Sequence, residues 1–399
     1  MTLGGAPLTS PASFATWVAR YRPDGSYLWS IVLGDNLTGV DAIAVDDSGD
    51  TFVSGSFTGP IDFGGGVRGA AGGLYLVKLS ASGLYLWDRV FPTTFTTAQR
   101  VAIVSPDRVA ISGTINGTID FGGGPITATG GTDNFVAAFS TASGAHAWSR
   151  ALTSSGDDAN YVDLVTVGGD VIVVGDFAST ALLGGDALTA QSAGDVYVVR
   201  YRGADGSHVW SMRQGGGGAG SASQPRRVVT DGTRLFVGGG FHGTVSFGGS
   251  SVTAPGTTTA AFIAAYDAID GSHTWSESFG ADNGASVVSL AAGSARLSAS
   301  FSFLGTFAIG GRTFSSTPLH IDTALARLNP TTGAPGAAST HFASSAASEG
   351  GQLVEAALTL AYASDRLAGV GTFSGSASLL GTDLVSAGGT DIAAFRVDF

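Results

Sequence analysis

A tryptophan recurs at nearly constant intervals along the chain, and this repetition limits the possible folds more than any other feature. Each copy closes a short glycine-led phrase, such as GSYLWS, GLYLWD or GSHVWS. Intervals of 58 to 65 residues separate Trp29, Trp87, Trp148, Trp210 and Trp275. A further copy has Ala337 where the next tryptophan is expected. The length of 399 residues alone suggests two or three domains. The repetition instead predicts one domain, residues 1–399, built of units of about 60 residues.

Each unit contains four short, largely apolar runs whose pattern has a period of two residues. Residues 40–45 (VDAIAV) and 51–57 (TFVSGSF) are joined by the tight turn DDSGD, which predicts a β-hairpin. A long glycine-rich connection follows, for example GTINGTIDFGGG in residues 113–124, and it contains a possible extra hairpin around its glycines. A third run and the tryptophan run complete the unit. Helical periodicity is missing throughout, so we expect an all-β fold made of repeated four-stranded antiparallel meanders, a single β-propeller.

The number of blades follows from counting strands, lettered A to D within each unit. Residues 14–33 supply one C and one D strand, and residues 352–399 supply A, B and C strands. With five complete sets between them, the chain has one strand more than six blades need. We expect six blades, closed by pairing of the terminal strands, with seven as the alternative. The surplus strand, residues 16–22 or 392–399, offers an apolar edge for self-association.

Polar residues gather in the connections from each D strand to the next A strand. In an antiparallel meander these connections leave the sheet at the same end as the B–C connections, opposite the short turns. Loops on a rigid scaffold are where propellers generally bind partners. The sequence therefore predicts partner-facing residues at Asp35, Asn36, Asp157, Asp158, Asn160, Asp282 and Asn283. Their oxygens suit Ca²⁺, but no loop has a full D-x-D-x-D spacing, so no metal or cofactor is predicted.

Catalytic motifs are not found. Gly215, Gly217 and Gly220 match G-x-G-x-x-G, but the segment after them reads as a strand, so phosphate would meet no helix N-terminus. His146, His208 and His273 each lie two residues before a tryptophan, where earlier units have Tyr27 and Tyr85. Equivalent positions on different blades cannot converge on one metal ion. We interpret this position as a slot for an amphipathic ring on the outer strand.

An aspartate recurs where the third strand of a unit begins. The four copies are Asp133, Asp195, Asp322 and Asp391. A carboxylate at this position is expected to accept hydrogen bonds from backbone N–H groups of the B–C connection.

Charge and composition exclude several classes of function. The net charge is −12 and Lys78 is the single lysine, so neither nucleic acid nor an anionic membrane surface is an expected partner. Without any cysteine, thiolate chemistry and disulfides are excluded. The first residues, MTLGGAPLTSPASF, lack the basic and apolar regions of a secretion signal. The low charge and Ser/Thr/Gly richness still favour an exported protein, located outside the cell, in the periplasm or on the cell surface.

The segments RYRPDGSYLW, KLSASGLYLW and AYDAIDGSHTW resemble the tryptophan-docking repeats of PQQ-like propellers. Over residues 14–399 the units also resemble the bacterial β-propeller repeats called SBBP. The resemblance implies that the five tryptophans pack each blade against its neighbour. It says little about function, because propellers host unrelated activities. We expect a non-catalytic binding or scaffold module for a protein or glycan partner, with a lectin as the alternative. A quinoprotein-type enzyme is a third possibility; resembling enzymes use calcium ligands and commonly a cysteine pair.

Overall fold

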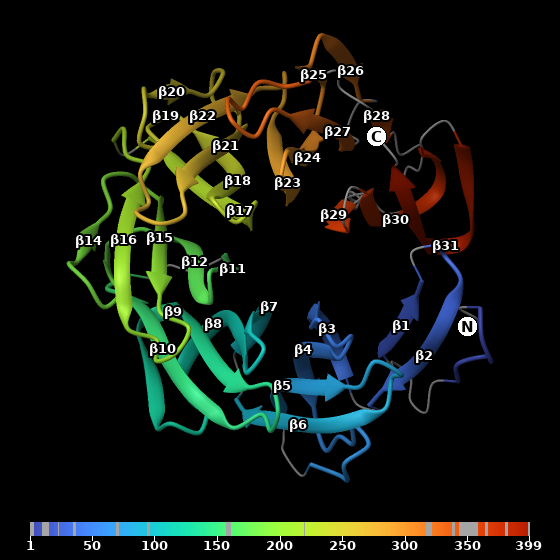
Figure 1. The fold of residues 1–399 in the computed structure, drawn as a ribbon. Helices are drawn as coiled ribbons and strands as arrows, with labels where there is room; N and C mark the ends of the chain where they lie inside the picture. Colours follow the sequence, from blue (N-terminus) through green and yellow to red (C-terminus); the bar gives the residue numbers. More distant parts are fainter. Residues whose placement is uncertain are drawn as a thin grey trace. The chain divides into compact units, whose positions relative to one another are not determined.

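The computed structural model describes residues 4–9, 16–22, 24–34, 37–68, 72–93, 96–156, 161–218, 220–316, 321–336, 340–342, 358–363, 366–379 and 382–397. In these ranges the chain forms β-strands and turns, and no segment is helical (Figure 1). A search of the same residues found no helix with the length and hydropathy needed to cross a membrane.

Five sheets of the described residues contain four main strands each, arranged in chain order, and we call these sets of strands blades 1 to 5. The sheet of blade 2 has two further short strands, which are described below. Blade 1 contains β3 (Leu37–Val45), β4 (Thr51–Thr58), β5 (Gly72–Leu79) and β6 (Tyr85–Pro92). Blade 2 contains β7 (Thr96–Ser105), β8 (Arg108–Asp120), β9 (Pro125–Ser140) and β10 (His146–Ser154). Blade 3 contains β11 (Val162–Val167), β12 (Asp170–Phe177), β15 (Asp195–Tyr201) and β16 (His208–Gln214).

Blades 4 and 5 repeat the same strand order. Blade 4 contains β17 (Ala222–Thr230), β18 (Arg234–His242), β21 (Ala260–Asp267) and β22 (His273–Phe279). Blade 5 contains β23 (Ala285–Gly293), β24 (Arg296–Phe303), β27 (Asp322–Leu328) and β28 (Thr340–Phe342). The strand pairs of blades 1, 2, 4 and 5 are antiparallel. The prediction of an all-β, propeller-type fold of four-stranded antiparallel blades is confirmed.

Incomplete sheets lie at the two ends of the described chain. β1 (Thr16–Tyr21) pairs with β2 (Tyr27–Leu33), in agreement with the expected C and D strands of residues 14–33. β29 (Leu358–Ala363), β30 (Arg366–Leu379) and β31 (Thr382–Val397) form a three-stranded sheet, as expected for A, B and C strands in residues 352–399. That these sheets complete one blade, and that the ring has six or seven blades, stay predictions.

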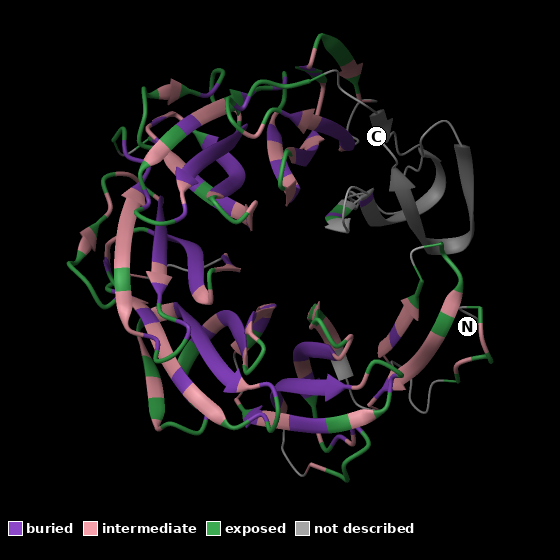
Figure 2. Cartoon of the chain, in the orientation of Figure 1, coloured by how far each residue is buried: buried purple, intermediate pink, exposed green. Residues whose placement is uncertain are grey.

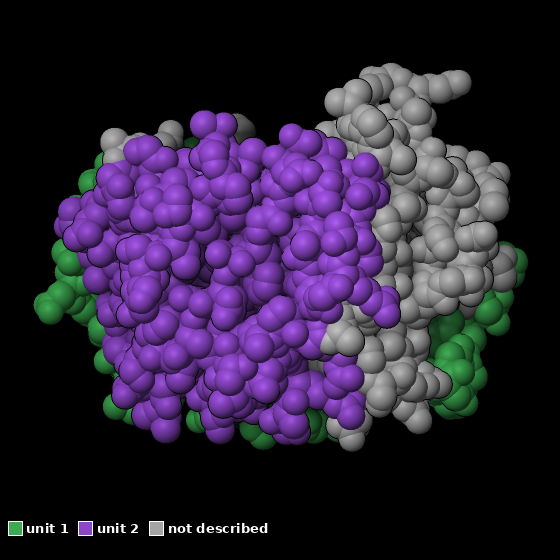
Figure 3. Space-filling model, turned by 90° about the horizontal axis from the view of Figure 1, so that it is seen from above, with its two compact units in different colours: residues 1–173, 179–187, 199–209 green, residues 174–178, 188–198, 210–399 purple. Residues whose placement is uncertain are grey.

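The chain divides into two compact units, coloured separately in Figure 3. The first comprises residues 1–173, 179–187 and 199–209, and the second comprises residues 174–178, 188–198 and 210–399. Within the first unit, β3, β7 and β11 are neighbours, and within the second unit β17, β23 and β29 are neighbours. Within each unit, the A strands of successive sheets therefore lie side by side. The prediction that residues 1–399 form a single domain stays a prediction.

The two middle strands of each blade form the core. In β4 and β5 nearly every residue is buried on both faces (Figure 2), and β18 and β21 show the same pattern. Strands buried on both faces favour continuous apolar runs over strict alternation. The outer strands β6 and β22 contain buried, half-buried and exposed positions, because they pack against the protein less completely than the middle strands.

The glycine-rich connection folds as a hairpin that packs between neighbouring sheets. In blade 2 it extends β8 and β9, with Thr118 paired to Thr127 and Asp120 to Pro125. The equivalent hairpins are β13 (Thr180–Leu182) with β14 (Leu188–Thr189), β19 (Thr244–Val245) with β20 (Val252–Thr253), and β25 (Thr306–Ile309) with β26 (Arg312–Ser315). The extra hairpin anticipated in the sequence is confirmed.

Phe121 shows how such a hairpin is held. Its ring is 2% exposed, and its centroid lies 4.9 Å from those of Phe135 in blade 2 and Phe91 in blade 1. In the next repeat the hairpin goes further and adds to the edge of the preceding blade, because Thr153 and Ser154 of β10 pair with β13. Through these contacts, the hairpins formed by the glycine-rich phrase help to join neighbouring sheets.

Candidate functional site

Each of the five predicted docking tryptophans donates its indole N–H to a carbonyl in the C–D turn of the next sheet. The Nε1–O distances are 2.9 Å for Trp29 to Ala81, 3.0 Å for Trp87 to Thr141, 2.8 Å for Trp148 to Gly203, 2.8 Å for Trp210 to Ile269, and 3.1 Å for Trp275 to Pro330. The three tryptophans of blades 1, 2 and 4 are buried, with 6–8% exposure. Those of β2 and blade 3 are half-buried.

A glycine in the same turn lies flat against the indole. Gly144 has φ of 67°, and a Cβ added there would lie 2.8 Å from Cε3 of Trp87. At Gly206, with φ of 69°, the added Cβ would lie 2.6 Å from Cδ2 of Trp148. Both the left-handed backbone and the missing side chain are required. The same contact explains the glycine that leads the later phrases, at Gly83, Gly144, Gly206, Gly271 and Gly333.

Arginines reinforce this contact in two blades. Arg89, two residues after Trp87, donates from Nε to the carbonyl of Gly144 at 2.9 Å. Arg150, two residues after Trp148, donates to the carbonyl of Gly206. Both guanidinium groups therefore donate hydrogen bonds to carbonyls in a turn of the next sheet and help to hold the two sheets together.

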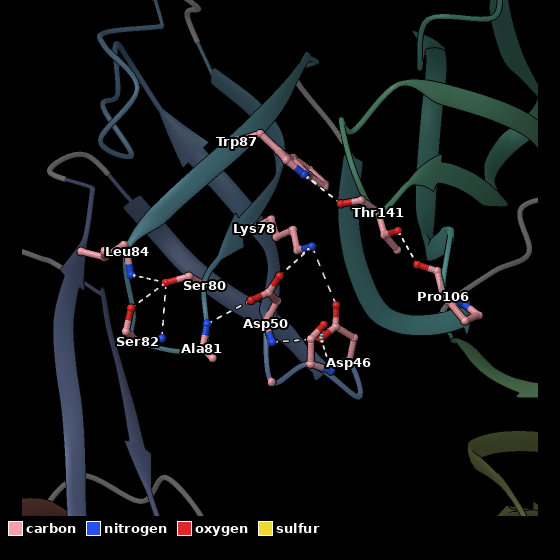
Figure 4. A network of polar contacts seen from close by, with 12 residues as sticks. Asp46, Asp50, Lys78, Ser80, Ala81, Ser82, Leu84, Trp87, Pro106 and Thr141 are labelled. Carbon is pink, nitrogen blue, oxygen red and sulfur yellow. Dashed lines mark hydrogen bonds and ion pairs between the residues drawn. The ribbon is translucent and has the colours of Figure 1, made fainter.

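Lys78 also takes part in fixing a turn (Figure 4). Its Nζ lies 2.9 Å from an Asp50 carboxylate oxygen and 3.8 Å from one of Asp46. The other oxygen of Asp50 accepts the N–H of Ala81 at 3.0 Å, and Ala81 is the residue whose carbonyl binds Trp29. The lysine is 8% exposed. It therefore supports the turn that the tryptophan contacts.

The recurring aspartates at the start of the third strand are buried acceptors. Asp133, 1% exposed, accepts from the N–H groups of Thr129 at 2.7 Å and Ser154 at 2.8 Å. Asp195, fully buried, accepts from the N–H groups of Gln191 and Gly216 and from Arg213. The predicted capping role is confirmed for these two residues. Asp322 is buried in the same position, and the side chain of Asp391 lies outside the described part.

The ring slot two residues before each tryptophan also has a structural contact. Tyr85 and His146 pack on Gly64–Gly65 and Gly122–Gly123, the tips of the hairpins of their own blades. No group of three or more His, Asp or Glu side chains gathers in a metal-binding arrangement among the residues that the structure describes. The slot therefore holds a ring against a glycine pair.

Of the predicted partner-facing residues, Asp282 and Asn283 lie in the described part. Both side chains are exposed. Their backbone is fixed by the hairpin of blade 5, since the N–H of Asp282 donates to Thr306 O at 3.2 Å and that of Asn283 to Leu304 O at 3.0 Å. One carboxylate oxygen of Asp282 accepts the N–H of Thr306 at 3.2 Å. Outside the described residues lie Asp35, Asn36, Asp157, Asp158 and Asn160.

The sequence analysis missed a row of charged residues on the inner strands of the first unit. Asp41 is the extra residue of a β-bulge in β3, and its side chain is exposed. Desolvation by the surrounding strands raises the pKa of Asp41 to about 6, against the opposing effect of Arg100. Arg100 donates from Nε to the Asp163 carboxylate at 2.6 Å.

The β-bulge of β3 has counterparts in other A strands, before Arg100 in β7, before Arg227 in β17 and before Ser289 in β23. The sequence contained a signal for these positions. The polar residue in each otherwise apolar A-strand run marks the place, as in VDAIAV and VDLVTV. Bulges commonly redirect side chains next to functional sites.

No family model matches the chain, and no curated protein sequence matches it. Among solved structures, BamB from Moraxella catarrhalis is similar with a TM-score of 0.44 and 14% identity, covering 88% of this chain and 87% of BamB. Quinohemoprotein alcohol dehydrogenase ADHIIG from Pseudomonas putida has a TM-score of 0.40 and 10% identity, covering 89% of this chain and 59% of the dehydrogenase. The WD40 domain of Neurospora crassa Pan2 has a TM-score of 0.40 and 11% identity, covering 76% and 68%. Similarity at this level assigns no function.

Proposed function

We propose that the protein is a non-catalytic, exported binding module that presents loops on one end of its blades to a glycan or protein partner. The observation that supports this best is the pair Asp282 and Asn283. Their side chains are exposed, while hydrogen bonds to the blade 5 hairpin hold their backbone. A carboxylate and an amide in a fixed, exposed loop lose little conformational entropy when they bind a partner.

The internal use of other polar groups supports the same proposal. Asp133 and Asp195 cap backbone N–H groups, and Lys78 pairs with carboxylates below a turn. These ionisable residues stabilise the repeated frame. Partner recognition then falls to side chains of the D–A loops, which vary from one repeat to the next.

A lectin is the second candidate, and the chemistry of the same loop favours it. The carboxylate accepts hydrogen bonds from sugar hydroxyl groups, and the amide both donates to them and accepts from them. Repeated blades would offer related loops, and weak single contacts would then add through avidity. A Ca²⁺ ion in such a loop would have Asp282 and Asn283 as its oxygen ligands.

A quinoprotein-type dehydrogenase fits the residues poorly. The chain has no cysteine for the adjacent pair found in resembling enzymes. In the described ranges, the acidic side chains do not gather into a calcium ligand set. We therefore derive no reaction for this chain.

A glycan array tests the proposal and separates its two forms. The wild-type protein and an Asp282→Ala/Asn283→Ala variant are compared with and without Ca²⁺. A lectin binds one class of glycan, and the variant loses that signal. If both proteins bind the same glycans equally, this loop is not the site.

A protein partner requires a different readout. A photo-crosslinking residue at Asn283 should capture one discrete partner from the extracellular fraction of the source organism. The matched control is the same residue at Ile269, which is 75% exposed in a C–D turn of the second unit. Equal capture from both positions would contradict recognition through the D–A loop.

A further inference from the structure

In blades 1 to 4, a ring at the start of the outer strand rests on a pair of glycines at the hairpin tip of the same repeat. In blade 4 the ring of His273 lies over Gly248 and Gly249, and a Cβ added at Gly249 would lie 2.6 Å from Cε1 of the ring. His146 over Gly123 and His208 over Gly185 are packed in the same way. The ring therefore fastens the hairpin to the sheet through direct contact with its backbone.

The chemical identity of this ring changes along the chain. The first two slots hold Tyr27, over Gly4 and Gly5, and Tyr85, over Gly64 and Gly65. Tyr27 Oη lies 3.0 Å from Ser30 Oγ, three residues further on. His146 Nε2 lies 3.1 Å from Ser149 Oγ at the same offset. Two of the five slots thus hold a tyrosine, whose ring stays neutral at physiological pH, and three hold a histidine, a side chain that ordinarily titrates near neutral pH.

The surroundings of His146 favour its neutral form. Burial lowers the pKa of His146, and the nearby carboxylate of Asp120 opposes this effect. The carboxylate already accepts the N–H groups of Gly122 and Gly124 at 2.7 and 3.1 Å. The ring of Phe139 packs edge-on against the imidazole, with centroids 6.2 Å apart.

His208 and His273 are in comparable environments. Burial lowers the pKa of His208, Arg150 lowers it further and Asp186 raises it, while the ring of Tyr201 packs edge-on against the imidazole. Burial alone lowers the pKa of His273, which packs against Tyr266. The Nε2 atom of His273 is buried without a hydrogen-bond partner in the described structure.

We propose that His146, His208 and His273 are a pH-sensitive fastening that releases the hairpins of blades 2, 3 and 4 in mild acid. An imidazolium ion held against glycine backbone and an aromatic ring loses part of its hydration, and burial is the largest cause of the lowered pKa at all three histidines. Protonation therefore favours the open slot, in which the half-buried ring becomes fully hydrated.

The direction of the pH effect follows from linkage. The pKa in the closed slot is lower than in the open one, so the open form binds more protons below the ordinary histidine value of about 6.5. The fastening is complete above that pH and weakens as the pH falls below it. The hairpin of blade 1, Ile61 to Arg68, is held by Tyr85 and keeps its contact over the same range.

Release would expose apolar residues that the hairpins hold between sheets. Phe121, Leu183 and Phe247 occupy the same position in the three hairpins and are 1–2% exposed. In blade 3 the hairpin also pairs with β10 of the preceding blade. Acid would therefore loosen contacts between sheets on the outer side of the blades.

Hydrogen exchange followed by mass spectrometry at pH 7.5 and 5.0, corrected for intrinsic exchange rates, tests the proposal. In wild-type protein, protection of residues 118–127, 180–189 and 244–253 should fall at pH 5.0. The expected loss is several-fold, because the open form binds more protons than the closed form at pH 5.0. Residues 61–68 should keep their protection and serve as the internal control.

The matched variant is His146→Tyr/His208→Tyr/His273→Tyr, because each slot has serine three residues later, as Tyr27 does. It should keep hairpin protection at pH 5.0 within about twofold, whereas His242→Tyr, at an exposed histidine, should behave as wild type. Equal acid loss in the wild type and the triple variant would overturn the proposal. If the variant does not fold, NMR titration of the wild-type rings decides. The proposal is supported if the histidine rings titrate with midpoints below pH 6.5 and the amide signals of Gly123 and Gly249 shift with the same midpoints. Titration midpoints at or above pH 6.5 contradict it.

Discussion

The indole N–H of Trp148 lies 2.8 Å from the carbonyl oxygen of Gly203, a residue 55 positions further along the chain in the next sheet. The same contact recurs for the four other docking tryptophans. A contact at the period of the repeat explains why the sequence keeps both partners, the tryptophan and the glycine-containing turn. It joins one sheet to the next through a single side chain.

Trp148→Ala should lower the free energy of unfolding by about 3–5 kcal/mol, because it removes a large buried ring and leaves a cavity between two sheets. The loss should be smaller for Trp210→Ala, since that ring is half-buried. Chemical denaturation measures both values. A change below about 0.5 kcal/mol for Trp148→Ala would mean that the ring is exposed in solution.

Gly206→Ala should destabilise the protein by about 1–3 kcal/mol without removing any contact. The new Cβ would meet Trp148 at 2.6 Å, and the backbone φ of 69° disfavours alanine. Gly232→Ala is the matched control, because φ there is 93° but nothing lies within 4 Å of the added Cβ. The difference in stability between the two variants isolates the steric contact with the indole. Equal losses would show that the indole does not lie against the turn.

Asp195→Ala should cost about 2–3 kcal/mol, because two backbone N–H groups and Arg213 lose their buried acceptor. The contacts that break run from Gln191, Gly216 and Arg213. Asp47→Ala, at an exposed turn position, should change stability by less than about 0.5 kcal/mol. Comparable losses in these two variants would contradict the capping role.

Asp41→Asn should raise stability at pH 7.5 and have little effect at pH 4. The pKa of Asp41 is about 6 in the folded chain and near 3.9 when unfolded. The folded state therefore binds more protons between these values, and ionisation costs stability as the pH rises through them. Because the side chain is exposed, the gain should be below about 1 kcal/mol. A loss of stability at pH 7.5 would show that the carboxylate makes a favourable contact.

Self-association through a surplus edge strand is tested by the mass in solution. If the edge of β1 or β31 pairs between copies, light scattering should show a dimer that dissociates on dilution. Ala19→Lys places a charge at a half-buried position on the edge of β1 and should block this pairing. Val18 is not a suitable position for the charge, because its side chain is buried. A monomer at all concentrations would contradict association through this edge.

Local patterns were sufficient to predict the strands, the repeat and the capping aspartates. Alternating apolar runs specify strands, and Asp133 lies four residues after the backbone N–H that it binds, in Thr129. Such information is contained within one unit. The sequence also predicted that the tryptophans dock on the neighbouring blade, whereas only the structure identifies the carbonyl groups that accept their indole N–H groups.

Contacts between sheets could not be predicted in the same way. Phe121 packs on Phe91 of the preceding blade, and no pattern within one unit specifies that pair. The sequence predicted a possible hairpin in the glycine-rich connection, but it did not show which neighbour the buried residues of this hairpin, Ile119 and Phe121, would contact. The elevated pKa of Asp41 depends likewise on neighbouring inner strands, which come from separate repeats.

Hydrogen exchange of the indole N–H groups, measured by NMR, tests the sheet-to-sheet contact most directly. If the tryptophans bind the next turn, the Nε1–H groups of Trp87, Trp148 and Trp275 should exchange several orders of magnitude more slowly than free indole, with the half-buried Trp29 and Trp210 faster. Rates close to those of free tryptophan for the buried three would show that neighbouring sheets are not joined in this way.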